Sequence, residues 1–192
     1  MPTYAGGMFE GLMANLVVPE TTWGTHSLGL DDLRWAEVQE KYATQVLHYP
    51  VWGMSPSSTA DDTGNYGGFG VEGLAFPAGE GLAQCTTCTS EDTVSPHASV
   101  IALPVLPQQA YANIEVLRSR YPGIYSSDGG FYDAVNPTTG SIGHRRLVLD
   151  QSMIMAALDD ALSVGSISSP SPPVPQSMIG PAWCLTDRCP ES

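Results

Sequence analysis

Basic side chains are scarce in this sequence of 192 residues, in which 7 Lys and Arg stand against 20 Asp and Glu and the formal charge is -13. Nucleic-acid backbones and anionic lipid surfaces are bound through clusters of positive charge. We therefore expect neither a nucleic-acid partner nor binding to an anionic membrane. The sequence also lacks an uninterrupted apolar run of about 18 residues, so no membrane-spanning helix is expected.

Cysteine is also rare, and the four residues form two pairs, Cys85-x-x-Cys88 and Cys184-x4-Cys189. A single zinc site would require the two pairs to meet from distant parts of the sequence. Local disulfides and unpaired thiols are simpler alternatives, and the spacing does not decide between them. The second pair lies in a Pro-rich stretch, which argues against a catalytic thiol there.

The composition favours one folded domain over residues 1–165, followed by a tail over 166–192. With 42% hydrophobic residues, the chain is long enough to bury one core of moderate size. The tail is rich in Ser and Pro and shows no apolar period, so we expect it to be extended and disordered. The opening residues, MPTYAGGMFE, lack the basic and apolar segments of a secretory signal, and none is predicted in this sequence.

Apolar residues at three- and four-residue spacing predict an all-α fold. The expected helices cover 6–18, 30–47, 95–103, 107–121 and 147–164. Pro96 and Pro107 fit the first position of a helix, where a missing amide hydrogen costs nothing. The last helix is apolar on most sides, which predicts that it is buried in the middle of the domain.

Residues 49–84 form a long stretch without any sustained period, rich in Gly, Ser, Asp and aromatic residues. An irregular loop of this length in a compact domain usually binds or covers something. A disordered linker is the alternative, but Trp52, Tyr66 and Phe69 argue against complete disorder. We expect its aromatic side chains to border a binding cleft.

Three acids lie at predicted helix starts or turns. Glu10 follows two glycines at a helix start, Asp133 lies in a Gly-rich aromatic turn, and Asp150 lies at the start of the last helix. Carboxylates at such junctions suit acid/base chemistry if they line one pocket. For Asp150 a structural role is equally open, because an acid in the first turn, followed here by Gln151, caps free amides and interacts favourably with the helix dipole.

His97 lies in the first turn of the helix that begins at Ser95 and Pro96. A single histidine at such a position is more often a hydrogen-bonded core or cap residue than a catalyst. Both interpretations stay open at this point.

The order of the motifs GGMFEGLM, VVPE, YPVWGMSPSS, YGGFGVEGLA, SPHASVIAL, GGFYDAVN and LDQSMIMAAL resembles the bacterial glucoamylase-like family, which includes endo-β-1,2-glucanases and the related domain of cyclic β-1,2-glucan synthases. The resemblance runs from Tyr4 to about Leu162 and is to the C-terminal part of the family domain. It implies an (α/α)6 toroid, of which five helices would form about half, with long irregular loops.

The resemblance also implies inverting hydrolysis of a β-glucan, most closely a β-1,2-linked one, without a metal or other cofactor. Glu10 matches the general acid, and Asp133 or Asp150 matches the carboxylate that activates water. The implied substrate-binding residues are Trp52, Tyr66, His97, Phe131, Tyr132 and Gln151. The family favours export to the periplasm or the medium.

Two other classes of function stay open. A partial toroid is compatible with a non-catalytic carbohydrate-binding remnant, or with a structural helical domain that associates with a partner. Half a ring leaves apolar helix faces uncovered, so we expect either self-association or pairing with the missing N-terminal half.

Overall fold

The computed structural model describes residues 2, 3, 5–75 and 93–162. Its α-helices are α1 (Met8–Leu12), α2 (Glu20–Trp23), α3 (Leu28–Lys41), α4 (Pro96–Ile101), α5 (Pro107–Arg120) and α6 (Val148–Leu162). Shorter helical turns are η1 (Met13–Leu16), η2 (Tyr42–Val46), η3 (Glu72–Leu74) and η4 (Pro122–Ile124). Within these ranges no helix is long and apolar enough to cross a membrane. The predicted tail, the four cysteines and residues 76–84 of the loop lie outside the described residues.

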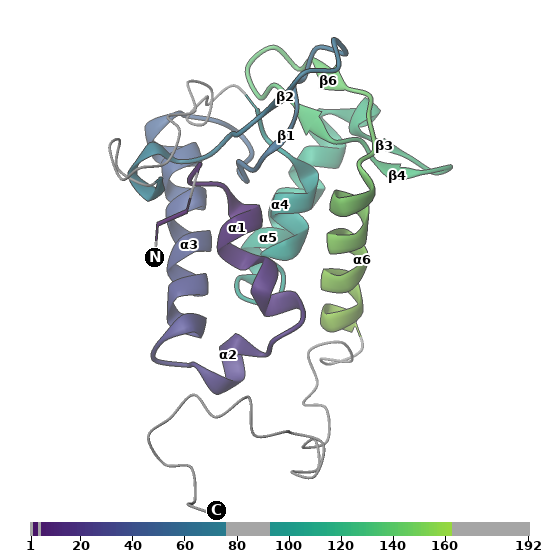
Figure 1. The fold of residues 1–192 in the computed structure, drawn as a ribbon. Helices are drawn as coiled ribbons and strands as arrows, with labels where there is room; N and C mark the ends of the chain where they lie inside the picture. Colours follow the sequence, from purple (N-terminus) through teal and green to yellow (C-terminus); the bar gives the residue numbers. More distant parts are fainter. Residues whose placement is uncertain (1, 4, 76–92, 163–192) are drawn as a thin grey trace, which may run out of the picture.

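Short strands join the helices into one structure, in three antiparallel pairs. These are β1 (Ser57–Ser58) with β2 (Tyr66–Gly67), β3 (Tyr125–Ser126) with β4 (Gly130–Phe131), and β5 (Ala134–Val135) with β6 (Ile142–Gly143). In Figure 1 they lie together above the helices, over the upper ends of α4 and α6. The helical prediction is confirmed in its main elements, but the all-α class leaves out these strands.

The predicted helix starts at Pro96 and Pro107 are confirmed, and Ser95 precedes the first of them in an extended conformation. Two features of the N-terminal part differ from the prediction. The first helix tightens into a 3-10 turn after Leu12, and the stretch expected to be a loop contains α2. Gly29 explains the close packing of α2 on α3, because a Cβ there would meet the Glu20 carbonyl at 2.5 Å.

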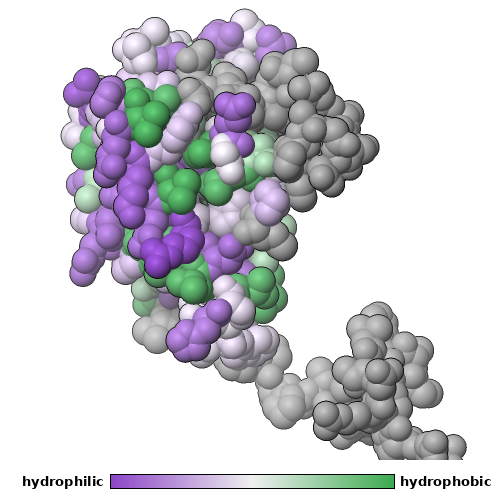
Figure 2. Space-filling model, turned by 90° about the vertical axis from the view of Figure 1, so that its left-hand side faces the viewer, coloured by the Kyte–Doolittle hydropathy of each residue, from purple (hydrophilic) through white to green (hydrophobic). Residues whose placement is uncertain are grey.

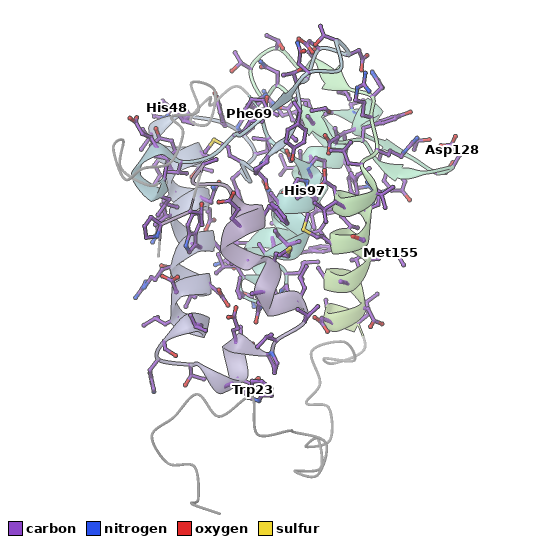
Figure 3. The ribbon with its side chains drawn as sticks, viewed as in Figure 1. Trp23, His48, Phe69, His97, Asp128 and Met155 are labelled. Carbon is purple, nitrogen blue, oxygen red and sulfur yellow. The ribbon has the colours of Figure 1, made fainter. Side chains whose placement is uncertain are left out.

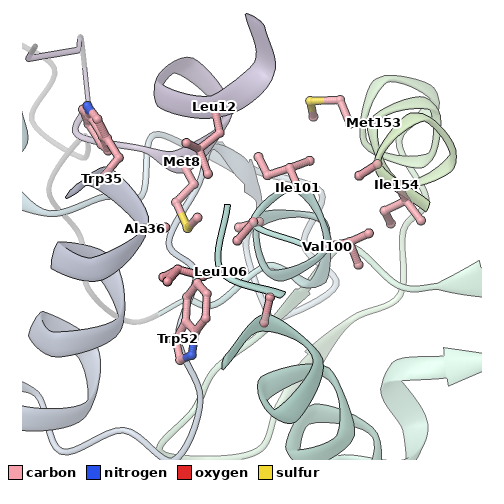
Figure 4. Close-up of a cluster of buried hydrophobic side chains, with 14 of the residues drawn as sticks. Met8, Leu12, Trp35, Ala36, Trp52, Val100, Ile101, Leu106, Met153 and Ile154 are labelled. Carbon is pink, nitrogen blue, oxygen red and sulfur yellow. The ribbon is translucent and has the colours of Figure 1, made fainter. Parts of the chain in front are cut away.

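The main hydrophobic core lies between α1, α3, α4 and α6 (Figure 4). Its larger members include Met8, Leu12, Trp35, Trp52, Ile101, Leu106 and Met153. All six residues of α4 are buried, so α4 is the central helix of the described structure. The expectation that α6 is buried on most sides is therefore wrong: α6 packs only one face on α4.

The outer side of α3 shows the surface expected of an amphipathic helix. Figure 2 looks onto this side and shows hydrophilic residues with hydrophobic ones between them. Arg34 and Lys41 both approach the carboxylate of Glu37, at 2.6 and 3.7 Å. These exposed pairs contribute little to stability and keep this face of the helix polar.

Two buried amide side chains hold the segment around Trp52 and Met54, which follows α3 and η2. Gln39 donates to the carbonyls of Gly6 and Met54 and accepts the amide of Met54, at 3.0 to 3.2 Å. Asn113 accepts the amide of Trp52 at 3.1 Å and donates to the Trp52 carbonyl at 2.8 Å. Since buried backbone groups need partners, these contacts hold the chain between the helices without a regular strand.

Asn113→Ala should therefore lower the free energy of unfolding by about 1–3 kcal/mol, because it leaves the buried Trp52 amide without a partner and leaves Ser99 Oγ as the donor to the Trp52 carbonyl. Urea denaturation measures the loss. Gln109→Ala, at an exposed position of the same helix, is the matched control and should change stability by less than about 0.5 kcal/mol. Equal effects of the two substitutions would show that Asn113 does not hold this segment.

The outer face of α6 carries a stripe of apolar residues at seven-residue spacing. Val148, Met155 and Leu162 are 87%, 68% and 81% exposed. Figure 3 shows Met155 on the outer side of the helix. Apolar residues exposed together along one helix face are candidates for an interface.

We expect the purified chain to self-associate through this stripe. Met155→Glu should shift sedimentation towards the monomer across a dilution series, because a charge at the centre of the stripe would have to be desolvated. Tyr111→Glu, at an exposed position on α5, introduces the same charge and should leave the association unchanged. A wild-type chain that sediments as a monomer at every concentration would contradict this expectation.

Candidate functional site

Glu10 and Asp150 occupy equivalent positions, since each is the third residue of its helix, α1 or α6. Asp133 lies between β4 and β5, where its backbone amide donates to the Arg145 carbonyl at 2.9 Å. Glu10 is exposed, whereas Asp133 and Asp150 are 2% and 3% exposed. The strand pairs and the start of α6 thus bring two of the predicted acids into the protein interior.

Asp133, Asp150 and His97 form one buried cluster, which we call the acid–histidine cluster. One nitrogen or oxygen atom from each side chain can be chosen so that all three lie within 4.8 Å of one another. His97 Nδ1 lies 3.4 Å from Asp150 Oδ2, and His97 is 1% exposed. Figure 3 places His97 near the middle of the molecule, between α1 and α6.

Hydrogen bonding in the cluster is incomplete. Asp133 Oδ2 accepts the amide of Ser58 at 2.6 Å. Asp133 Oδ1, Asp150 Oδ2 and both ring nitrogens of His97 have no hydrogen-bond partner among the described residues. Buried polar atoms without partners cost free energy, and they are commonest where a protein binds or transforms something.

Burial sets the charge of the cluster. It raises the pKa of Asp150 to about 9; a hydrogen bond that the carboxyl donates to Asp133 once it is protonated, and the charge of Asp133, act in the same direction. Burial also lowers the pKa of His97 to about 4, against the opposing charge of Asp133. At neutral pH the imidazole is therefore neutral, and Asp150 holds a proton beside Asp133, which we call the shared proton.

Tyr66 connects this cluster with Glu10. It is 59% exposed and lies opposite Ser58 in the β1–β2 pair. Burial raises the pKa of its hydroxyl, and the charges of Asp150, Asp133 and Glu10 raise it further. All three predicted acids therefore act on one tyrosine, which places Glu10 on the same side of the molecule as the cluster.

The capping interpretation of Asp150 is not supported by its contacts. Among the described residues no backbone amide donates to its carboxyl, and its neighbours are His97 and Asp133. Gln151 instead donates from Nε2 to the carbonyl of Phe131 at 3.1 Å, which ties the start of α6 to β4.

The other predicted sugar-binding residues fall into two groups. Phe131 and Tyr132 are half-buried; Phe131 packs edge-on against Tyr125 at 5.1 Å, and the Arg146 guanidinium lies 4.1 Å from the centre of the Tyr132 ring. Trp52 is 3% exposed in the main core, so its ring has no free face for a sugar. The expectation that Trp52 frames the cleft is corrected accordingly.

Sequence reasoning missed Ser58, which donates its amide to Asp133. The family resemblance implied that His97 binds substrate, whereas His97 is buried against Asp150. No local pattern marks Ser58, because it contributes a backbone group. For His97 the available signal was its position in the first turn of an apolar helix, which the structure shows to be fully buried.

Comparison with protein families gives a match over residues 20–169 to the family described as "Putative glucoamylase". The chain belongs to this family. The match covers α2 to α6, and thus the acid–histidine cluster, but begins after Glu10. Comparison with curated proteins gives no match.

Several solved structures have the same fold at low sequence identity. A "putative glucoamylase" from Bacteroides caccae is 18% identical with a TM-score of 0.61, over 83% of this chain and 36% of that one. An endo-β-1,2-glucanase from Chitinophaga pinensis, in complex with sophorotriose and glucose, is 16% identical with a TM-score of 0.60, over 81% and 35%. A β-1,2-glucanase from Parabacteroides distasonis is 14% identical with a TM-score of 0.59, over 81% and 21%. The chain thus spans about a third or less of their lengths.

A test of the shared proton is the pH dependence of stability in Asp150→Asn. An unfolded Asp titrates near pH 3.9. Between there and about pH 9 the native state binds more protons at Asp150, so its contribution to the free energy of unfolding falls as pH rises. Because the amide of Asp150→Asn cannot ionise, the variant does not lose this stability as pH rises. Its free energy of unfolding should match that of the wild type near pH 4 and exceed it by about 1–3 kcal/mol at pH 8.

Asp32→Asn is the comparison, because Asp32 is a buried acid of α3 outside the cluster. Burial, followed by the charges of Glu20 and Asp31, raises its pKa to about 7. The free energy of unfolding that Asp32→Asn gains over the wild type should also increase with pH, but only up to about pH 7. Urea denaturation from pH 4 to 9 measures both variants. A gain for Asp150→Asn that does not change with pH would exclude the shared proton.

Proposed function

We propose that this chain forms part of a glycoside hydrolase domain that binds β-glucan and hydrolyses it with inversion. The supporting observation is that Tyr66 is under the influence of Glu10, Asp133 and Asp150 together. Two carboxyl groups on either side of a glycosidic bond are sufficient for this chemistry. The family match favours the same class of reaction.

In this proposal Glu10 is the general acid. It is exposed and therefore accessible to the oxygen of a glycosidic bond. Protonation of that oxygen allows the bond to the anomeric carbon to break, while water attacks the same carbon from the opposite face. The attack from that face inverts the configuration.

Asp133 is the base that accepts a proton from the attacking water. Asp150 holds the shared proton at neutral pH and so is the weaker candidate for this role. The Ser58 amide stabilises the charged form of Asp133. Asp133 is 2% exposed and Tyr66 is 59% exposed, so in this proposal the water enters the site beside Tyr66.

A β-1,2-linked glucan is the substrate we favour. The structure from Chitinophaga pinensis is a complex with sophorotriose and glucose. In this chain Tyr66, Phe131 and Tyr132 offer aromatic surface that is at least partly exposed, which suits contact with sugar rings. We further propose that the helices form part of an (α/α)6 toroid.

A carbohydrate-binding role without hydrolysis is the second candidate. It is favoured by the extent of the chain, which covers 35% of the endo-β-1,2-glucanase it resembles. The site would then keep its aromatic surface and lack other groups needed for turnover.

The deciding experiment measures reducing ends released from linear β-1,2-glucan, with β-1,3-glucan and starch as comparison substrates. The wild-type chain should act on the first. Glu10→Gln and Asp133→Asn should each reduce the rate by about 100-fold or more, the usual contribution of a general acid or base. Glu72→Gln, at an exposed position, is the control and should be as active as the wild type.

Calorimetry with the same glucan distinguishes the alternatives. Binding without release of reducing ends would support the carbohydrate-binding role. Neither binding nor release would contradict both functions and leave a structural domain.

A further inference from the structure

We propose that the acid–histidine cluster is a binding site for a divalent transition-metal ion, held by His97, Asp133 and Asp150. No metal was expected from the sequence, where the three residues lie far apart. The binding inference stands on the geometry of the cluster alone. Its consequence for hydrolysis rests on the proposed function.

The three side chains supply the kinds of atom that such ions bind. An imidazole nitrogen and two carboxylate oxygens can be chosen within 4.8 Å of one another. With bonds of about 2.1 Å, two ligands of a tetrahedral centre are about 3.4 Å apart. His97 Nδ1 and Asp150 Oδ2 are 3.4 Å apart, so this pair already has the required separation.

The candidate ligand atoms are also available. Asp133 Oδ1, Asp150 Oδ2 and both nitrogens of His97 have no hydrogen-bond partner among the described residues. The remaining oxygen of Asp133 accepts the Ser58 amide, which orients its carboxylate. A partner of this kind behind a metal ligand is the usual way in which proteins fix ligand geometry.

The charge of the cluster favours a cation. In the part of the chain that the structure describes, no Lys or Arg lies within ion-pair distance of Asp133 or Asp150. Two arginines close in sequence to Asp150 make other contacts: Arg145 lies against Gly64, and Arg146 lies over Tyr132 and 3.6 Å from Asp128. Two buried carboxyls need compensating positive charge, which a proton supplies in part and a divalent ion supplies in full.

The donor set indicates the class of metal. Two carboxylates suit Mn²⁺, and an imidazole suits Zn²⁺ and Fe²⁺, whereas an all-oxygen set would favour Mg²⁺ or Ca²⁺. The ligands come from α4, from the turn before β5 and from α6. A bound ion would therefore join three separate elements and stabilise the folded state. The ion would displace the shared proton and bind the carboxylate of Asp133, which we propose as the base.

The test uses the full chain, freed of metal with a chelator, and Mn²⁺ as the probe, because thiolates at the four cysteines prefer softer ions. Equilibrium dialysis should give one Mn²⁺ per chain, and the melting temperature should rise with Mn²⁺ concentration. His97→Gln and Asp150→Asn should each weaken binding by about 10-fold or more, as loss of a ligand does. His26→Gln, at an exposed histidine, is the control and should bind as the wild type does.

Asp150→Asn keeps the test valid if His97→Gln fails to fold, because an amide closely resembles the protonated carboxyl. No binding by the wild type, or equal binding by the wild type and both cluster variants, would overturn the proposal. Hydrolysis is measured separately on the metal-free chain, so an inactive chain that binds Mn²⁺ would contradict only the proposed function. If both proposals hold, Mn²⁺ should inhibit hydrolysis, and the inhibition should be weaker in His97→Gln.

Discussion

Two carboxyl groups that lie in the interior, with no Lys or Arg partner among the described residues, are the central constraint of this structure. Asp133 and Asp150 are close enough to share a hydrogen bond, and His97 beside them is kept neutral by burial. Two negative charges at this separation inside a protein are very costly. The native state must therefore hold a proton or a metal ion at this place, and either one connects the chemistry of the site to the stability of the fold.

The rest of the described structure serves to bring these side chains together. The fully buried helix α4 carries His97, and α6 packs against it so that Asp150 meets the imidazole. The β1–β2 pair contributes from the other side, with the Ser58 amide on Asp133 and Tyr66 opposite Ser58. Asn113 and Gln39 hold the preceding segment in place, so an irregular stretch of chain is as well defined as the helices around it.

Much of this arrangement is predictable from local sequence. The Pro residues at 96 and 107 mark the starts of α4 and α5, and the apolar spacing finds α3 and α6. The candidate acids were also found locally, because Gly-rich turns and helix starts are recognisable. The family resemblance supplied the expectation that they belong to one site, and the family is confirmed by the match over residues 20–169.

Long-range contacts explain what the sequence did not predict. Trp52 lies in a Gly-rich stretch that suggested an exposed aromatic, but its backbone exchanges two hydrogen bonds with Asn113, 61 residues away, which hold it in the core. The strands have two residues each, too short to show an alternating pattern. The stripe of Val148, Met155 and Leu162 has the same composition as a buried face, and only the position of α4 shows which side of α6 faces outward.

The most direct measurement of the central claim is a carbon-13 NMR titration of the aspartate side-chain carboxyls in the metal-free protein. The Asp150 signal is assigned by its loss in Asp150→Asn. We predict that Asp150 stays protonated through neutral pH and titrates only well above it, since burial and Asp133 both raise its pKa. An Asp150 carboxyl that titrates near pH 4, as in an unfolded chain, would contradict the shared proton and with it the account of the site given above.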